Sequence, residues 1–213
     1  CSSDLRLNNY AKNKKTLTGR ATNIAMAMAL ASSEVNASMG KIVACPTAGS
    51  CGILPAVILA AGEVLELSED EMINGLLAAS AVGMIIGMNA TLSGAEGGCQ
   101  AECGSASAMG AAAVVELMGG TPKMSLDAGS IILQNVLGLV CDPVAGLVEI
   151  PCAKRNAQGA ITALCTADMV MAGVEAKIPF DDAVEAMYKV GKSLPSALRE
   201  TAMGGVAATK EGL

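Results

Sequence analysis

Apolar residues recur along most of the chain with the spacing of a helix face, and Gly, Pro and capping residues interrupt them at intervals. The expected helices cover residues 21–39, 53–67, 104–120 and 157–176, and further helices start at Ser68, Ser125 and Asp181. Ser68 and Glu71 have the spacing of a capping box. No segment alternates as a strand does, and no Asn-Gly hairpin occurs. The pattern therefore predicts an all-α fold in a single compact domain.

The composition also favours closely packed helices over a sheet. Hydrophobic residues make up 52% of the chain but aromatic residues only 1%, and 24 of the 213 residues are Gly. Strands prefer aromatic and β-branched side chains, whereas small residues suit helices whose backbones approach closely. A formal net charge of −6, with no basic stripe, excludes the usual signature of nucleic-acid binding, so we expect no nucleic-acid partner.

The longest uncharged run, residues 74–95, is long enough to cross a bilayer. It contains Asn, Ser, Thr and four Gly, has no aromatic belt and lacks flanking Lys or Arg. The sequence therefore predicts a buried core helix here and no membrane partner.

Because no secretory signal accompanies the eight cysteines, we expect reduced thiols in the cytoplasm rather than disulfides.

Six of the eight cysteines lie in three Gly- and Pro-rich breaks, with the sequences "CPTAGSCG", "EGGCQAECG" and "CDPVAGLVEIPCAKRN". Functional residues concentrate in such loops, whereas Cys165 lies within a predicted helix and is expected to be an inert buried thiol. The chain contains no His, which excludes Cys-His and Ser-His-Asp machinery within it and disfavours zinc. An iron–sulfur cluster needs only thiolates. Cluster ligation and structural or incidental thiols both stay open from spacing alone.

Four long motifs resemble the α chain of the bacterial iron–sulfur L-serine dehydratases: "ACPTAGSCGILPAV", "EGGCQAECGSASAMGAAAVVELMGG", "CDPVAGLVEIPCAKRNAQGA" and "LRETAMGGVAAT". The resemblance implies an all-helical catalytic domain whose Gly- and Pro-rich loops converge on an iron–sulfur site. It implies conversion of L-serine to pyruvate and ammonia without pyridoxal phosphate. It also implies a [4Fe-4S] cluster held by Cys99, Cys141 and Cys152, with one open iron acting as a Lewis acid.

Other polar residues of these motifs are candidates for binding the substrate. The backbone N–H groups before the helix at Ile53, with the Thr47 and Ser50 hydroxyls, could cradle a carboxylate. The planar guanidinium of Arg155 also suits a carboxylate. Asn156 is either a second polar contact or the cap of the helix expected from residue 157.

The candidate site residues do not include a clear general base. Removal of the serine Cα proton needs an acceptor with a pKa near neutrality, which histidine usually supplies. The carboxylates near the motifs, including Glu96, Glu102 and Asp142, have the alternative roles of caps or solvated loop charges. The resemblance implies a β chain or β domain with a histidine-containing motif, so we expect a hetero- or homo-oligomer whose partner supplies the base and docks on an apolar patch near the three loops.

Two alternative functions remain at this stage. One is a related iron–sulfur lyase that acts on threonine or cysteine, and the other is a non-catalytic iron–sulfur module for electron transfer or sensing. As for domains, residues 1–5 are expected to be a translated adapter sequence, a scar that does not belong to the natural protein. Residues 6–213 are expected to form the catalytic domain, without an N-terminal portion that the resembling α chains carry.

Overall fold

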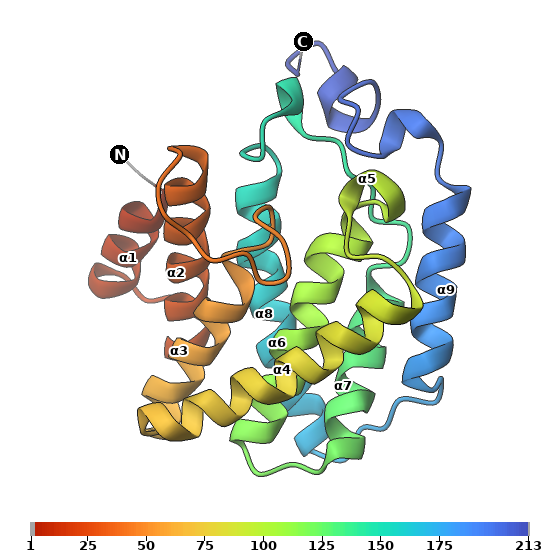
Figure 1. Cartoon of the computed structure of the whole chain (residues 1–213). Coiled ribbons are helices and arrows are strands. Elements are labelled where there is room, and N and C mark those ends of the chain that lie inside the picture. The colour runs from red at the N-terminus through yellow and green to blue at the C-terminus, as the bar shows by residue number, and fades with distance from the viewer. Residues whose placement is uncertain (1–2, 213) are drawn as a thin grey trace.

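The computed structural model describes residues 3–212 as a bundle of packed helices (Figure 1). They are α1 (Ser3–Asn13), α2 (Arg20–Ala37), α3 (Ile53–Leu65), α4 (Glu69–Asn89), α5 (Gly94–Gly97), α6 (Ser105–Leu117), α7 (Pro122–Asn135), α8 (Cys152–Met171) and α9 (Phe180–Ser193). A π-helical turn, Gln100–Gly104, precedes α6, and single 3₁₀ turns cover Val144–Gly146, Ser196–Leu198 and Gly205–Ala208. No strand forms within residues 3–212, so the prediction of an all-α fold is confirmed.

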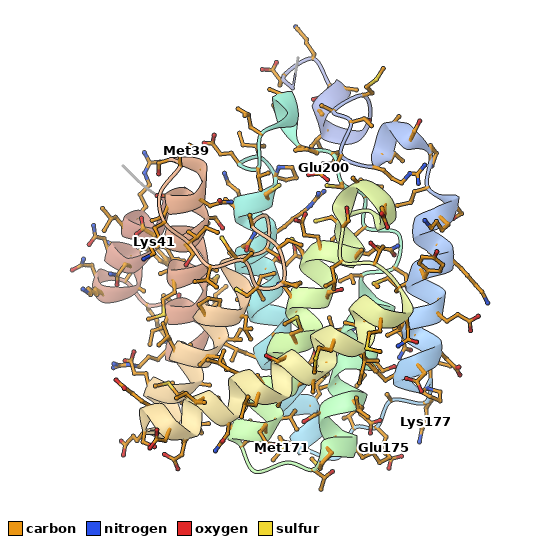
Figure 2. The ribbon with its side chains drawn as sticks, viewed as in Figure 1. Met39, Lys41, Met171, Glu175, Lys177 and Glu200 are labelled. Carbon is orange, nitrogen blue, oxygen red and sulfur yellow. The ribbon has the colours of Figure 1, made fainter. Side chains whose placement is uncertain are left out.

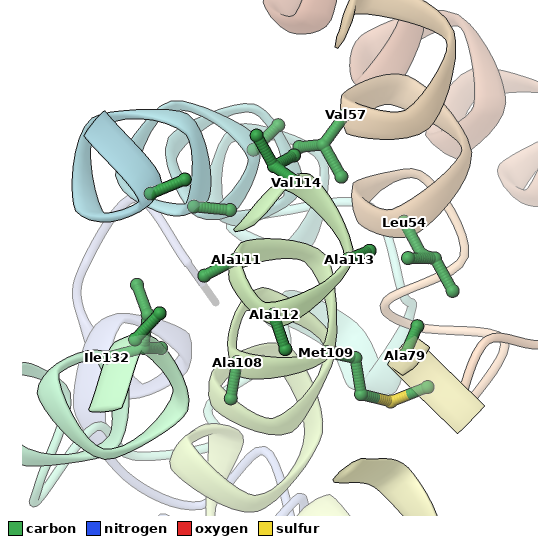
Figure 3. Packing of buried hydrophobic residues seen from close by; sticks show 14 of the residues in the cluster. Leu54, Val57, Ala79, Ala108, Met109, Ala111, Ala112, Ala113, Val114 and Ile132 are labelled. Carbon is green, nitrogen blue, oxygen red and sulfur yellow. The ribbon is translucent and has the colours of Figure 1, made fainter. Parts of the chain in front are cut away.

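Helix α6 forms the centre of the bundle. Every residue of α6 from Ser105 to Val115 is buried, because α3, α4, α7 and α8 all pack against it. Figure 3 shows alanines of α6 facing larger side chains of the surrounding helices, among them Leu54, Val57 and Ile132. Outside this centre, α2 covers α3 and α8, while α9 packs on α7. Phe180 is the one aromatic side chain buried among the described residues, so the core is filled mainly by aliphatic side chains of helices lying close together.

Small residues set these close distances. A Cβ atom added at Gly83 of α4 would lie 2.9 Å from Cε of Met109 on α6. A Cβ added at Gly110 of α6 would lie 3.0 Å from Cγ2 of Val57 on α3. Both distances are shorter than ordinary van der Waals contact, so a larger residue at either position would force the facing side chain or its helix to shift.

Two predicted helix starts were wrong. Thr121, not Ser125, caps α7, and its side chain accepts a hydrogen bond from the backbone of Met124. Ser125 lies inside the helix and donates to the carbonyl of Ala112 instead. Asp181 lies in the first turn of α9 without capping it; the helix begins at Phe180. Pro suits the first turn of a helix, so α7 can begin at Pro122 once Thr121 caps it.

The capping box at α4 is confirmed: Ser68 and Glu71 exchange side-chain-to-backbone hydrogen bonds in both directions. The helix that follows is long and apolar enough to cross a membrane by length and composition alone, which core helices also satisfy. Only one face of α4 is buried, however. Leu77, Met84 and Met88 on the other face are exposed by 64%, 62% and 84%. The expectation of a buried core helix therefore holds for one face of α4 only.

The helix α1 is absent from the predicted set, because its sequence is mostly polar. It packs against α2. Of the expected scar, residues 1 and 2 lie outside the described residues, and Ser3 to Leu5 belong to α1. The scar stays a prediction.

Candidate active site

Three cysteines from distant segments approach one another beside the N-terminal end of α6. We call Cys99, Cys141 and Cys152 the cysteine group; their exposed fractions are 1%, 3% and 5%. Cys99 directly precedes the π-helical turn, Cys141 follows α7 in an extended segment, and Cys152 begins α8. Cys99 and Cys141 share a small buried cluster with Cys103. A negative charge on Cys99 raises the pKa values of both Cys141 and Cys152, so the three thiols lie in one electrostatic neighbourhood.

The C-terminal segment holds Cys141 in place. The Cys141 N–H donates to the carbonyl of Leu198 at 2.9 Å, and the Cys141 carbonyl accepts from the N–H of Glu200 at 2.7 Å. The next residue, Asp142, accepts from the N–H of Val206 at 2.7 Å. Gly205 has φ = +61°, and a Cβ there would lie 2.2 Å from Oδ2 of Asp142, so this close approach requires glycine. The "LRETAMGGVAAT" motif thereby acquires a physical role.

Arg155 links the same segment to α8. Its Nη2 lies 2.9 Å from Oδ1 of Asp142, and its Nη1 donates to the carbonyl of Val140 at 2.9 Å. The two side chains are exposed by only 16% and 3%. These contacts use both Nη atoms of the guanidinium group, so Arg155 positions the segment that carries Cys141. Direct binding of a substrate carboxylate by Arg155 stays a prediction.

Asn156 lies inside α8, and its predicted role as a helix cap is wrong. Its Nδ2 donates to the carbonyls of Gly49 at 2.7 Å and Cys152 at 2.9 Å, and its Oδ1 accepts from the N–H of Gly52 at 2.9 Å. The side chain is 1% exposed. Asn156 therefore fastens the loop before α3 to the helix that carries Cys152. The cap prediction failed because α8 begins at Cys152 rather than at residue 157.

The loop that Asn156 holds is the predicted carboxylate cradle, residues 46–52, which we call the cradle loop. The backbone N–H groups of residues 47–50 donate to no acceptor among the described residues. The Thr47 and Ser50 hydroxyls lie 2.9 Å apart, and Thr47 donates to Oε1 of Glu102 at 2.6 Å. The N–H groups are thus available to an anion, whereas the Thr47 hydroxyl is engaged with a carboxylate.

The sequence did not predict the structural roles of two buried residues of the π-helical turn, Glu102 and Gln100. Glu102 is 9% exposed and lies at the cradle loop, although the sequence offered only a cap or a solvated charge for it. Gln100 is fully buried: it donates to the carbonyls of Gly97 and Met187 and accepts from the N–H of Gly138. Gln100 thus ties the turn beside Cys99 to α9 and to the loop after α7. Their only sequence signal was the presence of two polar residues in a Gly-rich, cysteine-bearing segment.

The thiols and Glu102 differ in acidity. The pKa of Cys99 is lowered, first because the Cys103 thiol donates to it and also because Arg155 is near. Burial, followed by the charge of Cys99, raises the pKa of Cys141 and brings that of Cys152 to about 12. Burial raises the pKa of Glu102, and the Thr47 hydrogen bond offsets part of the rise. Binding of a cation would favour the ionised forms of all these groups.

The cysteine group fits a cluster in donor type and burial, and it does not fit a single ion. Within residues 3–212, no three His, Cys, Asp or Glu side chains lie close enough together to hold one metal ion. A cubane distributes its thiolate ligands over separate iron atoms, so its ligands surround a larger space. A Cβ added at Gly94 would lie 2.9 Å from Sγ of Cys141, so only glycine allows this segment to approach the sulfur so closely.

Cys165 differs from the other cysteines. It is exposed, which corrects the expectation of a buried thiol. It lies on α8, about 20 Å along the helix axis from Cys152 at 1.5 Å per residue. Its side chain faces away from the packed side of α8, so it does not belong to the site.

Comparison with known proteins identifies the family of the chain. The family model "Serine dehydratase alpha chain" matches residues 2–207. The "L-serine dehydratase, alpha chain" of Peptoniphilus asaccharolyticus is 56% identical over 95% of this chain and 70% of the relative. The "Probable L-serine dehydratase, alpha chain" of Bacillus subtilis (strain 168) is 52% identical over 98% of this chain and 69% of the relative. "L-serine dehydratase TdcG" of Escherichia coli (strain K12) is 45% identical over 84% of this chain but only 40% of the relative. This chain belongs to the serine dehydratase alpha chain family.

Proposed function

We propose that this chain is the catalytic α chain of an L-serine dehydratase, a lyase that converts L-serine to pyruvate and ammonia. The support is family membership together with relatives that carry this activity in their names over most of the chain. The observation that carries the proposal furthest is that the cysteine group is buried beside the cradle loop, whose N–H groups at residues 47–50 have no acceptor among the described residues and which Thr47 joins to Glu102 in the turn before α6. The seven cysteines among the described residues are all free thiols, which favours a cytoplasmic enzyme.

Cys99, Cys141 and Cys152 would hold a [4Fe-4S] cluster. When bound, a cluster with three protein ligands supplies a Lewis acid that favours departure of the substrate hydroxyl without pyridoxal phosphate. The chain contributes the thiolates and the contacts that position them. Asp142 and Arg155 fix the segment of Cys141, while Asn156 joins the helix of Cys152 to the cradle loop.

The cradle loop would bind the substrate carboxylate. The N–H groups of residues 47–50 have no acceptor among the described residues and precede the N-terminus of α3, where the helix dipole favours an anion. Ser50 donates back to the Thr47 carbonyl or contacts the Thr47 hydroxyl, which stabilises the turn. A carboxylate held here has its charge balanced by N–H groups, which favours loss of the adjacent Cα proton.

A partner would supply the proton acceptor. The chain contains no His, and the α-chain names of the relatives imply a β chain. The matched Escherichia coli relative is more than twice as long as the segment it shares with this chain. The segments around the site also expose large apolar side chains: Val43, Leu147, Ile150 and Met203. These observations support docking of a β chain or β domain over the site, with an imidazole that removes the Cα proton.

Anaerobic reconstitution tests the proposal. The chain is incubated with iron and sulfide, its iron and sulfide content is measured, and pyruvate formation is assayed with the chain alone and with a family β chain. We expect pyruvate only on mixing, and loss of iron from variants in which a member of the cysteine group is replaced by Ser, because a hydroxyl is a poor ligand for cluster iron. Cys165→Ala is the matched control and should retain iron.

The same assay separates the alternatives. Faster turnover of threonine or cysteine than of serine would identify a related lyase. A cluster that retains all its iron but supports no turnover with any β chain would indicate an electron-transfer or sensor module. Full activity of the lone chain would contradict the role of the partner.

A further inference from the structure

The carboxylate of Glu102 is buried at the site with one oxygen unused. The residue is 9% exposed, and Oε1 accepts the hydrogen bond from Thr47 at 2.6 Å. Oε1 is the oxygen that accepts this bond, and no side-chain or backbone donor among the described residues bonds to Oε2. Oε2 is not one of the fully buried side-chain oxygens without a partner, so a ligand can reach it, and a donor that pairs with it would be bound favourably.

Two glycines show where this carboxylate lies. A Cβ added at Gly49, in the cradle loop, would lie 2.5 Å from Oε1 of Glu102. A Cβ added at Gly94 would lie 3.2 Å from Oε2 of Glu102 and 2.9 Å from Sγ of Cys141. The carboxylate is therefore held between the cradle loop and the cysteine group, and Oε2 is the oxygen on the side of Cys141.

The charges near Glu102 leave it without a cation of its own. Its charged neighbours are Glu200, which opposes its ionisation, and Arg155, which favours it. Arg155 is already paired with Asp142 at 2.9 Å. Glu102 thus has no positive side chain of its own among the described residues, and a positively charged group of a ligand would pair with it.

An amino-acid zwitterion provides that group in the required place. We propose that Oε2 of Glu102 binds the α-ammonium group of the substrate, while the N–H groups of the cradle loop bind its carboxylate. The two subsites border the same loop, since Thr47 contributes its backbone N–H to one and its hydroxyl to the other. Glu102 then selects 2-amino acids over 2-hydroxy acids of the same shape. This inference rests on the proposed function.

The geometry separates this role from that of a general base. The Thr47 hydroxyl orients Oε1, and the lack of a side chain at Gly49 lets the cradle loop lie close to the same oxygen. An ammonium group forms a strong charge-assisted hydrogen bond to a carboxylate. Its loss affects binding of every amine ligand, reactive or not, whereas loss of a base affects turnover alone.

The test uses the reconstituted complex of this chain with a family β chain. L-alanine and L-lactate differ only in the 2-substituent and carry no hydroxyl at C3 to eliminate. Their dissociation constants are measured by equilibrium dialysis, and KM and kcat are measured for L-serine. The variants are Glu102→Gln, which keeps the shape and an acceptor for Thr47, and Thr47→Val, which frees Oε1. Glu96→Gln, at an exposed residue of α5, is the matched control for the change in charge.

We expect Glu102→Gln to weaken L-alanine binding and raise KM for L-serine at least tenfold, with L-lactate binding changed less than twofold. Thr47→Val should shift selectivity in the same direction by a smaller factor, and Glu96→Gln should leave both ligands unchanged. Equal weakening of alanine and lactate in both variants would overturn the inference. A fall in kcat with unchanged alanine binding would also overturn it, in favour of a base. Absence of pyruvate from the wild-type complex would instead contradict the proposed function.

Discussion

Arg155 and Asp142 form an ion pair across the segment that carries Cys141, with Nη2 and Oδ1 2.9 Å apart and little exposure of either side chain. The pair joins three parts of the chain, because Asp142 also accepts the N–H of Val206 and Arg155 projects from α8. For function, the pair matters because it sets the position of Cys141, a proposed cluster ligand. For stability, loss of Asp142 would leave the partly buried Arg155 without its carboxylate, with the Val140 carbonyl and the Cys99 thiol as its remaining partners.

Asp142→Asn should therefore destabilise the apo-protein and reduce iron retention. Removing one partner of a buried pair costs about 3 kcal/mol, and the free energy of unfolding by urea, followed by circular dichroism, measures it. Glu185→Gln, in the exposed pair with Lys189, is the control and should leave the unfolding midpoint unchanged. Equal midpoints for the wild type and Asp142→Asn would show that the pair does not fix the segment.

Asn156→Leu should release the cradle loop. Leucine has a similar shape but leaves the Gly52 N–H and the Gly49 carbonyl without their partner, at a cost of roughly 2 kcal/mol. Amide hydrogen exchange at Gly52 should accelerate selectively, which a general loss of stability would not produce. Gln158→Leu, at an exposed position on the same helix, is the matched control. Unchanged exchange at Gly52 in Asn156→Leu would count against this role.

The parts of the fold that local patterns specify could be predicted from the sequence. Ser68 and Glu71 cap α4 as expected, since both members of a capping box lie within one turn. The choice between Thr121 and Ser125 could not be made so easily, because both residue types favour the cap. Packing decides it: Ser125 is buried against α6, where its hydroxyl finds the Ala112 carbonyl.

In the site, too, local sequence specifies some features and tertiary packing decides others. The loops that bear the cysteines could be found from Gly, Pro and Cys spacing, but the burial of Glu102 could not, because it depends on the cradle loop some fifty residues earlier in the chain. The predicted burial of Cys165 was wrong for a related reason. A cysteine in a helix is usually buried, and only the packing of α8 shows that residue 165 faces outward.

Glu102 should give the apo-protein a characteristic pH dependence. Its folded-state pKa is raised from the ordinary value of 4.5, chiefly by burial. Folding is therefore favoured at low pH, and this contribution is lost as the pH rises from about 4.5 through the raised pKa. The stability of Glu102→Gln relative to the wild type should rise over that window. Thermal melts at a series of pH values measure the difference.

Glu71 provides a control of opposite sign. Its pKa is lowered by the hydrogen bonds from Ser68, so its contribution is present above pH 4.5 and is lost as the pH falls. Glu71→Gln should thus lose stability relative to the wild type as the pH rises. Parallel pH profiles for the two variants would contradict the assignment for Glu102.

Gly94→Ala should impair cluster retention with the fold intact. The added Cβ would lie 2.9 Å from Sγ of Cys141 and 3.2 Å from the Glu102 carboxylate, so it occupies the space beside both groups. We expect iron and sulfide content after reconstitution to fall by at least half. Gly87→Ala is the control, since its nearest neighbour would be 3.3 Å away and Ala favours a helix interior over Gly. Full iron content in Gly94→Ala would show that this space is not needed.

Docking of the β chain should depend on the apolar residues at the end of the molecule that carries the site. Figure 2 places Met39 and Glu200 at this end and Glu175 and Lys177 at the opposite one. Leu147 and Met203, on segments beside Cys141, are exposed by 60% and 76%. Exposed apolar side chains gain free energy when a partner covers them, and a carboxylate placed there would have to be desolvated instead.

Leu147→Asp and Met203→Asp should each weaken association with the β chain at least tenfold, as measured by analytical ultracentrifugation of the mixed chains. Val174→Asp is the matched control, because it is exposed by 49% beside Glu175, at the opposite end. The iron content of the isolated variants should equal that of the wild type, since neither side chain belongs to the cysteine group. Pyruvate formation should recover when the β chain is added in excess, because the substitution weakens docking and leaves the site itself unchanged. Weakening by Val174→Asp alone would place the interface at the other end of the bundle and separate it from the site.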